Sequence, residues 1–146
     1  MPIAINGSGS ITGINAGGLP DNCITTAEIA ANAVTIDKMG SAEQSGLCKA
    51  WVNFNGTGTV AIRASYNVSS ITDNGVGDYT VNFATALVDA NYSAVVTGGR
   101  DSTTSGWSLG VIRSLSAAPT TTAVRVGTLN LSNWIDCTDV CVSIFR

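Results

Sequence analysis

The sequence predicts a mainly β protein, an antiparallel β-sandwich of about seven short strands preceded by a slender N-terminal segment. From residue 49 onward, apolar residues recur at every second position in short runs that glycine, asparagine and proline turns separate. The first 48 residues instead carry isolated apolar residues among Gly, Ser, Asn and Ala. We therefore divide the chain into an extended attachment segment at 1–20, a short helical stalk and collar at 21–48, and a head domain at 49–146.

The attachment segment is predicted to be extended. Ile3, Ile5, Ile11 and Ile14 alternate with small and polar residues, in a stretch too small to bury a core of its own. Pro20 then marks a break, because proline disfavours a helical conformation in the residue before it.

In the stalk segment an apolar residue recurs at every fifth position, at Ile24, Ile29, Val34 and Met39. This spacing fits neither a heptad coiled coil nor one face of a straight helix. Two interpretations are open. Either three chains wind together with these residues as their interface, or the segment is an ordinary helix packed on its own domain. Roughly forty small residues bury too little area to offset their ordering entropy alone, which favours the trimeric stalk.

Short helical turns are predicted within the stalk. Thr25 suits an N-cap, with Glu28 at the capping-box position, and Thr35 with Asp37 can begin a second turn. Residues 41–49 are predicted to form a linker or collar.

The head domain is predicted to contain strands at 50–55, 59–68, 78–84, 92–98, 106–115, 122–131 and 139–146. In the second strand, apolar residues on every second position are predicted to form a buried face: Val60, Ile62, Ala64, Tyr66 and Val68. Asn74-Gly75 is predicted to form a tight hairpin, because both residue types accept positive φ.

The later strands repeat this alternation. Tyr79, Val81 and Phe83 share one face after the hairpin, as do Trp107, Leu109 and Val111 in the strand at 106–115. Val124 and Val126 are predicted to point inward and Arg125 outward. The strand at 139–146 is apolar on both faces, which predicts a central place in its sheet or a position at a subunit contact.

Five motifs occur in order along residues 49–97: AWVNFNG at 50–56, IR at 62–63, SYNV at 65–68, GDYTVNF at 77–83 and DANY at 89–92. With them this stretch resembles the C-terminal domain of bacteriophage tail-fibre and other virion-fibre proteins. Such fibres often carry Met-Pro before the DANY run, where this chain has Leu87-Val88, which implies a local change in the approach to the next strand. Beyond residue 98 the resemblance fades, as expected of tips that vary with the host.

The resemblance implies a homotrimeric structural protein of a phage virion. It would contact other virion proteins of the tail, baseplate or capsid and attach to a host cell-surface polysaccharide. The ten-residue unit at 24–38, in which ITTAE and VTIDK are near-copies, also resembles the shaft and collar repeats of phage fibres.

Composition favours an assembled protein over an isolated one. Only 12% of the 146 residues are charged, and the mean hydropathy is +0.27, which is apolar for a small monomer and predicts a shared interface. The net charge of −3 without a basic cluster disfavours nucleic-acid binding. No apolar run approaches the roughly 20 residues of a membrane span, and the N-terminus lacks secretory-signal features. We expect synthesis in a host cytoplasm and a final location in the virion.

Catalysis and cofactor binding are not expected. The chain has no His, so it offers no imidazole as a base or as a metal ligand. The carboxylates that could be paired for glycoside hydrolysis lie in predicted loops without an apolar pocket: Asp73, Asp78, Asp89 and Asp101. Residues 73–79 could form a calcium loop or, as we favour, a plain hairpin turn.

The four cysteines, Cys23, Cys48, Cys137 and Cys141, lack the two-residue spacing of a zinc knuckle. Cys137 and Cys141 leave two possibilities open, a small disulfide loop or buried thiols. A cytoplasmic assembly site is reducing and favours thiols.

Two loops are candidates for receptor binding. Residues 98–107 hold Arg100, Asp101 and Trp107 among glycines and hydroxyls, and Trp134 lies in a second predicted loop. An aromatic face can stack on a sugar ring while polar groups bind its hydroxyls. Alternatively, Trp107 plugs the end of the sandwich. Three copies would add avidity to weak single contacts.

The whole protein therefore has four possible roles. We favour a tail fibre that attaches to polysaccharide. The alternatives are a capsid or collar decoration fibre without a receptor, a polysaccharide-cleaving fibre, and a free-standing cellular lectin, which would lack the ten-residue repeat at 24–38.

Overall fold

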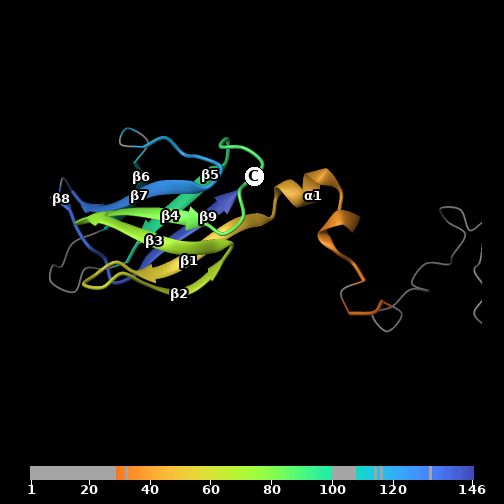
Figure 1. The fold of residues 1–146 in the computed structure, drawn as a ribbon, viewed down its shortest axis with the longest axis horizontal. Coiled ribbons are helices and arrows are strands. Elements are labelled where there is room, and N and C mark those ends of the chain that lie inside the picture. Colours follow the sequence, from red (N-terminus) through yellow and green to blue (C-terminus); the bar gives the residue numbers. More distant parts are fainter. Residues whose placement is uncertain (1–28, 32, 100–107, 114, 116, 132) are drawn as a thin grey trace, which may run out of the picture. The chain divides into compact units, whose positions relative to one another are not determined.

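The computed structural model describes residues 29–31, 33–99, 108–113, 115, 117–131 and 133–146. The chain divides into two compact units, Met1–Gly40 and Ser41–Arg146. The second unit is a sandwich of two antiparallel sheets, which confirms the predicted fold class (Figure 1).

The first sheet has four strands, and each neighbouring pair is antiparallel. In spatial order they are β2 (Ala61–Tyr66), β1 (Cys48–Asn55), β9 (Val140–Phe145) and β5 (Ser93–Gly98). Because β9 lies between β1 and β5, the predicted central place of the last strand is confirmed.

The second sheet has five strands, again antiparallel throughout. In spatial order they are β3 (Val68–Gly75), β4 (Asp78–Phe83), β7 (Ala123–Asn130) and β6 (Leu109–Ile112), and β8 (Asn133–Trp134) also pairs with β7.

The core lies between the two sheets and is built from alternate residues of their inner strands. Phe54 and Tyr79 meet edge to face across it, with ring centroids 5.1 Å apart. Buried with them are Val52, Val81, Val124, Val126, Val140, Val142 and Ile144. The predicted inward faces of β4 and β7 are therefore confirmed.

The prediction of one strand over 59–68 is wrong. β2 ends at Tyr66, Asn67 adopts a left-handed φ of 54°, and β3 continues in the other sheet. The Asn67 side chain fixes this corner, because Nδ2 donates to the carbonyls of Lys49 and Thr85 and Oδ1 accepts from the Thr85 N–H. Asparagine tolerates the left-handed region better than most residues.

The predicted buried face of 60–68 is confirmed at its ends, where Val60 and Val68 pack against the core, and is wrong between them, where Ile62, Ala64 and Tyr66 are exposed. Ile62 pairs with the core residue Phe54, whereas Ala64 pairs with Asn53, so a bulge at Arg63 separates them. A bulge shifts the alternation of side chains by one residue. Tyr66, which pairs with Trp51, is consequently 59% exposed on the outer face of the four-stranded sheet.

The β3–β4 hairpin reverses direction at Val76-Gly77 and not at Asn74-Gly75. Gly77 has φ +62°, and Gly75, which ends β3, has φ +125°. The Asp73 carboxylate accepts from the Gly75 N–H. Residues 73–79 thus form a hairpin, which confirms the interpretation that the sequence favoured.

The strand predicted at 106–115 is shorter than expected. β6 begins at Leu109 and ends at Ile112, and Trp107 lies outside the described residues. Leu109 and Val111 share one face as predicted, and it is the outer face of the five-stranded sheet.

The segment before the sandwich holds short helical turns. In the first unit a 3-10 turn, η1 (Ile36–Lys38), follows Thr35, as predicted, although Thr35 makes no side-chain cap. At 29–31 and 33–35 the described residues form no helix. In the second unit, helix α1 (Ser41–Ser45) and the start of β1 occupy the stretch predicted as a linker or collar at 41–49.

Among the predicted stalk residues, Ile29 and Val34 are exposed in the single chain, and Met39 is half-buried. Ile24 lies outside the described residues.

Candidate functional site

Of the four predicted receptor residues, the structure describes Trp134 alone, since Arg100, Asp101 and Trp107 lie outside the described residues. The sequence predicted that Trp134 lies in a loop. In the structure it belongs to the short strand β8, so that prediction is wrong. It pairs with Leu129 of β7, and its side chain is 40% exposed.

Hydrogen bonds on both sides hold β8 in place. The chain leaves β7 through a tight turn that begins at Leu131, with φ 48°. After Trp134, the Ile135 N–H donates to the Thr128 carbonyl over 3.1 Å, and Thr128 Oγ1 donates to the Ile135 carbonyl over 2.6 Å. These bonds fold β8 back on β7 and set the position of the indole.

The indole ring lies over Gly127. A Cβ at this glycine would come within 2.5 Å of Cζ3 of Trp134, so only glycine permits so close an approach. The guanidinium carbon of Arg113 lies 4.0 Å from the centroid of the ring, which is cation–π geometry. Arg113 follows β6, so β6, β7 and β8 together build this contact.

Asp78 joins Arg113 to Arg125. Its carboxylate accepts two hydrogen bonds from Arg125, from Nε to Oδ1 at 2.8 Å and from Nη2 to Oδ2 at 2.6 Å. It also forms an ion pair with Arg113, whose Nη1 lies 3.0 Å from Oδ2. Asp78 is only 6% exposed. The hydrogen bonds from Arg125 and the positive charge of Arg113 nevertheless hold the pKa of Asp78 below its ordinary value.

Asp78 begins β4, as the strand predicted at 78–84 has it, and so does not lie in a loop, where the candidate carboxylates were expected. Its lowered pKa keeps it ionised at neutral pH, where it is a partner for guanidinium groups and a poor general acid.

Beside this cluster the outer face of the sheet is polar. Thr80 pairs with Arg125 and Asn82 with Ala123, so both side chains lie on the same side as Arg125. The Asn82 amide donates to Thr72 Oγ1 at 3.0 Å. The same Asn82 amide donates to Ser70 Oγ. The Asn74 amide donates to Thr80 Oγ1.

We call this surface the Trp134 face: Trp134, Arg113, Arg125, Asp78, Thr80, Asn82 and Thr72. It combines an aromatic ring, charged donors and a ladder of hydroxyl and amide groups on an open sheet. Surfaces of this chemistry bind polyhydroxylated ligands, because the ring contacts apolar C–H groups while donors and acceptors bind hydroxyls.

A buried network stiffens the same end of the sandwich. The Tyr79 hydroxyl shares its proton between two acceptors, the Asp136 carboxylate and the Gly56 carbonyl, each 2.8 Å away. Asp136 also accepts from the Gly77 N–H over 2.7 Å. Burial, with Asp136 close by, raises the pKa of Tyr79 and keeps its hydroxyl protonated. The hairpin that carries Asp78 is thereby tied to the segment that follows Trp134.

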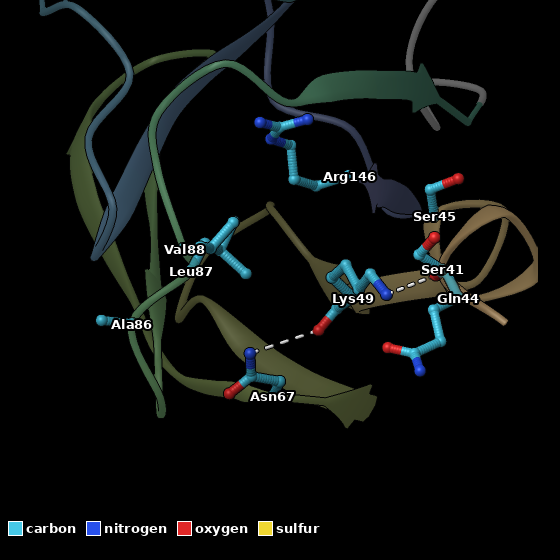
Figure 2. Close-up of a pocket in the computed structure, with 9 residues that line it drawn as sticks. All are labelled: Ser41, Gln44, Ser45, Lys49, Asn67, Ala86, Leu87, Val88 and Arg146. Atoms are coloured by element: carbon cyan, nitrogen blue, oxygen red, sulfur yellow. Dashed lines mark hydrogen bonds between the residues drawn. The ribbon is translucent and has the colours of Figure 1, made fainter. Parts of the chain in front are cut away.

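A pocket of about 470 Å³ lies beside α1, and Figure 2 shows the residues that line it. Lys49 Nζ donates to the Gln44 carbonyl, and Arg146 makes a bidentate pair with Asp89. The hydrogen bonds from Arg146 lower the pKa of Asp89. None of the described lining residues is one that the sequence predicted as a site residue.

The described cysteines are free thiols. Cys137 is buried, and Cys48 and Cys141 are half-buried, so the disulfide alternative for Cys137 and Cys141 is wrong. Cys23 lies outside the described residues. Within the described part of the chain no group of three or more acidic, His or Cys residues is arranged to hold a metal ion.

No described helix combines the length and the apolar character that spanning a membrane requires. Comparison of the chain with protein-family models, with curated proteins and with solved structures finds no match.

Proposed function

We propose that this chain is a structural fibre protein of a phage virion and that it attaches to a host-surface polysaccharide through the Trp134 face. The observation that carries the proposal is the placement of Trp134 over Gly127, beside Arg113 and next to the hydroxyl and amide ladder of β3 and β4. The fold supports it, because a two-sheet sandwich presents a broad, rigid face.

The chemistry of such attachment is simple. The apolar side of a sugar ring would lie on the exposed part of the indole, and its hydroxyls would bond Arg125, Thr80 and Asn82. Along β7 the distance from Gly127 to Ala123 is about 13 Å, at roughly 3.3 Å per residue. A short oligosaccharide would cover it. A single open site of this kind binds at about the millimolar level, near −4 kcal/mol.

Assembly of several copies would raise this weak affinity. When one of several linked sites lets go of the polysaccharide, it rebinds at a high effective concentration. The overall affinity of the assembly therefore rises without any new contact. The apolar repeat at Ile24, Ile29, Val34 and Met39 supports a homotrimer, and the exposed Ile29 and Val34 would gain burial if copies met there. Other virion proteins would hold the N-terminal end.

The test is polysaccharide binding by the full chain. An array of bacterial surface polysaccharides should yield at least one ligand, and Trp134→Ala should weaken its binding about five- to thirtyfold, the equivalent of about 1–2 kcal/mol for the lost contact with the ring. Thr80→Val should weaken it less. Leu115→Ser is the matched control, because Leu115 is fully exposed outside the Trp134 face.

Circular dichroism must show that each variant is folded. Unchanged binding by folded Trp134→Ala would exclude the Trp134 face as the site. No binding to any host polysaccharide would favour the decoration or collar fibre, and shortened polysaccharide chains would favour the cleaving fibre.

A further inference from the structure

The pocket beside α1 is a second place in the sandwich with the dimensions of a ligand site (Figure 2). Its volume of about 470 Å³ lies within the range of about 300–1,000 Å³ that is usual for small-molecule sites. Its described lining holds two basic residues, Lys49 and Arg146, and no acidic one. It shares no described residue with the Trp134 face, so the two are separate sites.

The two basic residues of the pocket differ in how their charge is balanced. Arg146 forms a bidentate ion pair with Asp89. Lys49 is half-buried, and its Nζ donates to a neutral acceptor, the Gln44 carbonyl, at 2.5 Å. Within the described part of the chain Lys49 forms no ion pair, and Glu43, the acid of α1, is exposed away from the described lining. An anion beside Lys49 would therefore be stabilised.

Lys49 is held in place at both its main chain and its side chain. The Asn67 amide donates to the Lys49 carbonyl and to the Thr85 carbonyl, each over 3.2 Å. These bonds join the start of β1 to the segment that leads to Leu87. Together with the bond from Nζ to α1, they fix the ammonium group before any ligand arrives, which lowers the entropy cost of binding.

The remaining lining combines polar and apolar groups. Ser41, Gln44 and Ser45 of α1 contribute hydroxyl and amide groups. Leu87 and Val88 contribute apolar surface, and Val88 is 83% exposed. A sugar ring matches such a lining, because its hydroxyls bond polar groups and its C–H groups cover apolar ones.

We propose that this pocket binds a sugar residue that carries a carboxylate. The carboxylate would accept from Lys49 Nζ in a charge-assisted hydrogen bond, and the ring would lie against Leu87 and Val88. A neutral sugar would leave the ammonium group without an anion, and a bare anion would leave the apolar surface in water. Because its residues are not those of the Trp134 face, this inference does not rest on the proposed function.

The experiment is acetylation of lysine in the full chain, with rates read by mass spectrometry. The chain has two lysines, and Lys38, which is exposed outside the described lining, is the internal control. The probes are glucuronate, galacturonate and N-acetylneuraminate. At about 10 mM, tenfold above a millimolar dissociation constant, at least one should slow acetylation of Lys49 about threefold or more and leave Lys38 unchanged. Unchanged acetylation of Lys49 with all three would overturn the proposal.

Glucose and acetate at the same concentration separate the two parts of the ligand. We expect each to protect Lys49 less than the acidic sugar does. Equal protection by glucose would show that charge does not select the ligand. Equal protection by acetate would show that Lys49 binds an adventitious anion only. Either result would overturn the proposal.

Lys49→Gln and Lys49→Arg test the role of the charge in a nuclear magnetic resonance titration that follows the Val88 amide. Lys49→Gln should weaken binding of the acidic sugar about tenfold, and Lys49→Arg should weaken it less. Lys38→Gln is the matched control and should bind as the wild type does. Wild-type affinity in a folded Lys49→Gln protein would contradict the proposal. Trp134→Ala should leave the protection of Lys49 unchanged, so this proposal and the proposed function fail independently.

Discussion

Asp78 organises the charged half of the Trp134 face. Its carboxylate holds Arg125 through two hydrogen bonds and Arg113 through an ion pair, while Arg113 stacks on Trp134. A nearly buried ion pair adds little net stability, since desolvation offsets the attraction. Its removal is costly, because it leaves two guanidinium groups without their anion. Asp78 therefore positions Arg113 as well as stabilising the sheet.

Asp78→Asn should lower the free energy of unfolding at pH 7 by about 2 kcal/mol, below the full cost of breaking a buried pair because both arginines are partly exposed. The folded pKa of Asp78 lies below its unfolded value of about 3.9. Its contribution is therefore present above that value and is lost as pH falls through the folded pKa.

Urea denaturation at pH 7 and near pH 3 measures both effects. The wild type should lose more stability on acidification than Asp78→Asn does. Asp139→Asn, which removes an exposed pair with Arg63, is the control and should change stability by less than about 1 kcal/mol. Identical acid dependence in wild type and Asp78→Asn would contradict the assigned role.

At the residue scale, the sequence predicted Trp134 as a candidate site residue but predicted none of the residues that contact it. An aromatic residue among polar ones is visible in a sequence. Asp78 and Arg125 are 47 positions apart, and the pairing of β4 with β7 brings them together. Arg113 joins them because β6 pairs with the other edge of β7. No local pattern carries this information, since strand order decides it.

Each inner strand is anchored in the sandwich by a few apolar residues at alternate positions, which pack into the core between the sheets. In β4, Tyr79 and Val81 point into the core, while Thr80 and Asn82 lie on the Trp134 face. One strand therefore contributes both to the stability of the sandwich and to the candidate site.

Val81→Asp should prevent the sandwich from folding. Val81 is 1% exposed, and an unpaired buried charge costs several kcal/mol, comparable to the total stability of about 5–15 kcal/mol. Thr72→Asp, on the exposed side of the neighbouring strand β3, should stay folded. Near-ultraviolet circular dichroism and resistance to protease read out the difference. A cooperatively folded Val81→Asp protein would show that the face assignment of β4 is wrong.

At the element scale, the predicted ranges of β1, β4, β5, β7 and β9 agree with the observed strands, because alternate residues of each strand pack into the core. The prediction failed at the edge strand β2 and at the corner that follows it. Residues 60–68 alternate without interruption in the sequence, yet a bulge at Arg63 and the corner at Asn67 divide them. Edge strands and corners are fixed by backbone geometry and by single hydrogen bonds, which apolar periodicity does not record.

At the scale of the whole sandwich, the Trp134 face lies on the outside of the five-stranded sheet. Because two packed sheets turn their outer faces away from each other, this face takes no part in the contact between the sheets. The proposed multivalent attachment requires a face of this kind to stay open on every copy.

At this scale the sequence predicted the fold class from composition and alternation, and the two sheets confirm it. Composition also predicted a shared interface, but it could not place one. An apolar residue has the same signature in a sequence whether it enters its own core, as Val142 does, or faces outward, as Val95 does.

Light scattering of the intact chain tests the assembly on which the proposed adhesive function depends. We predict a mass about three times the 14.9 kDa of one chain at micromolar concentration. A mass of one chain under those conditions would contradict both the shared stalk and the multivalent attachment.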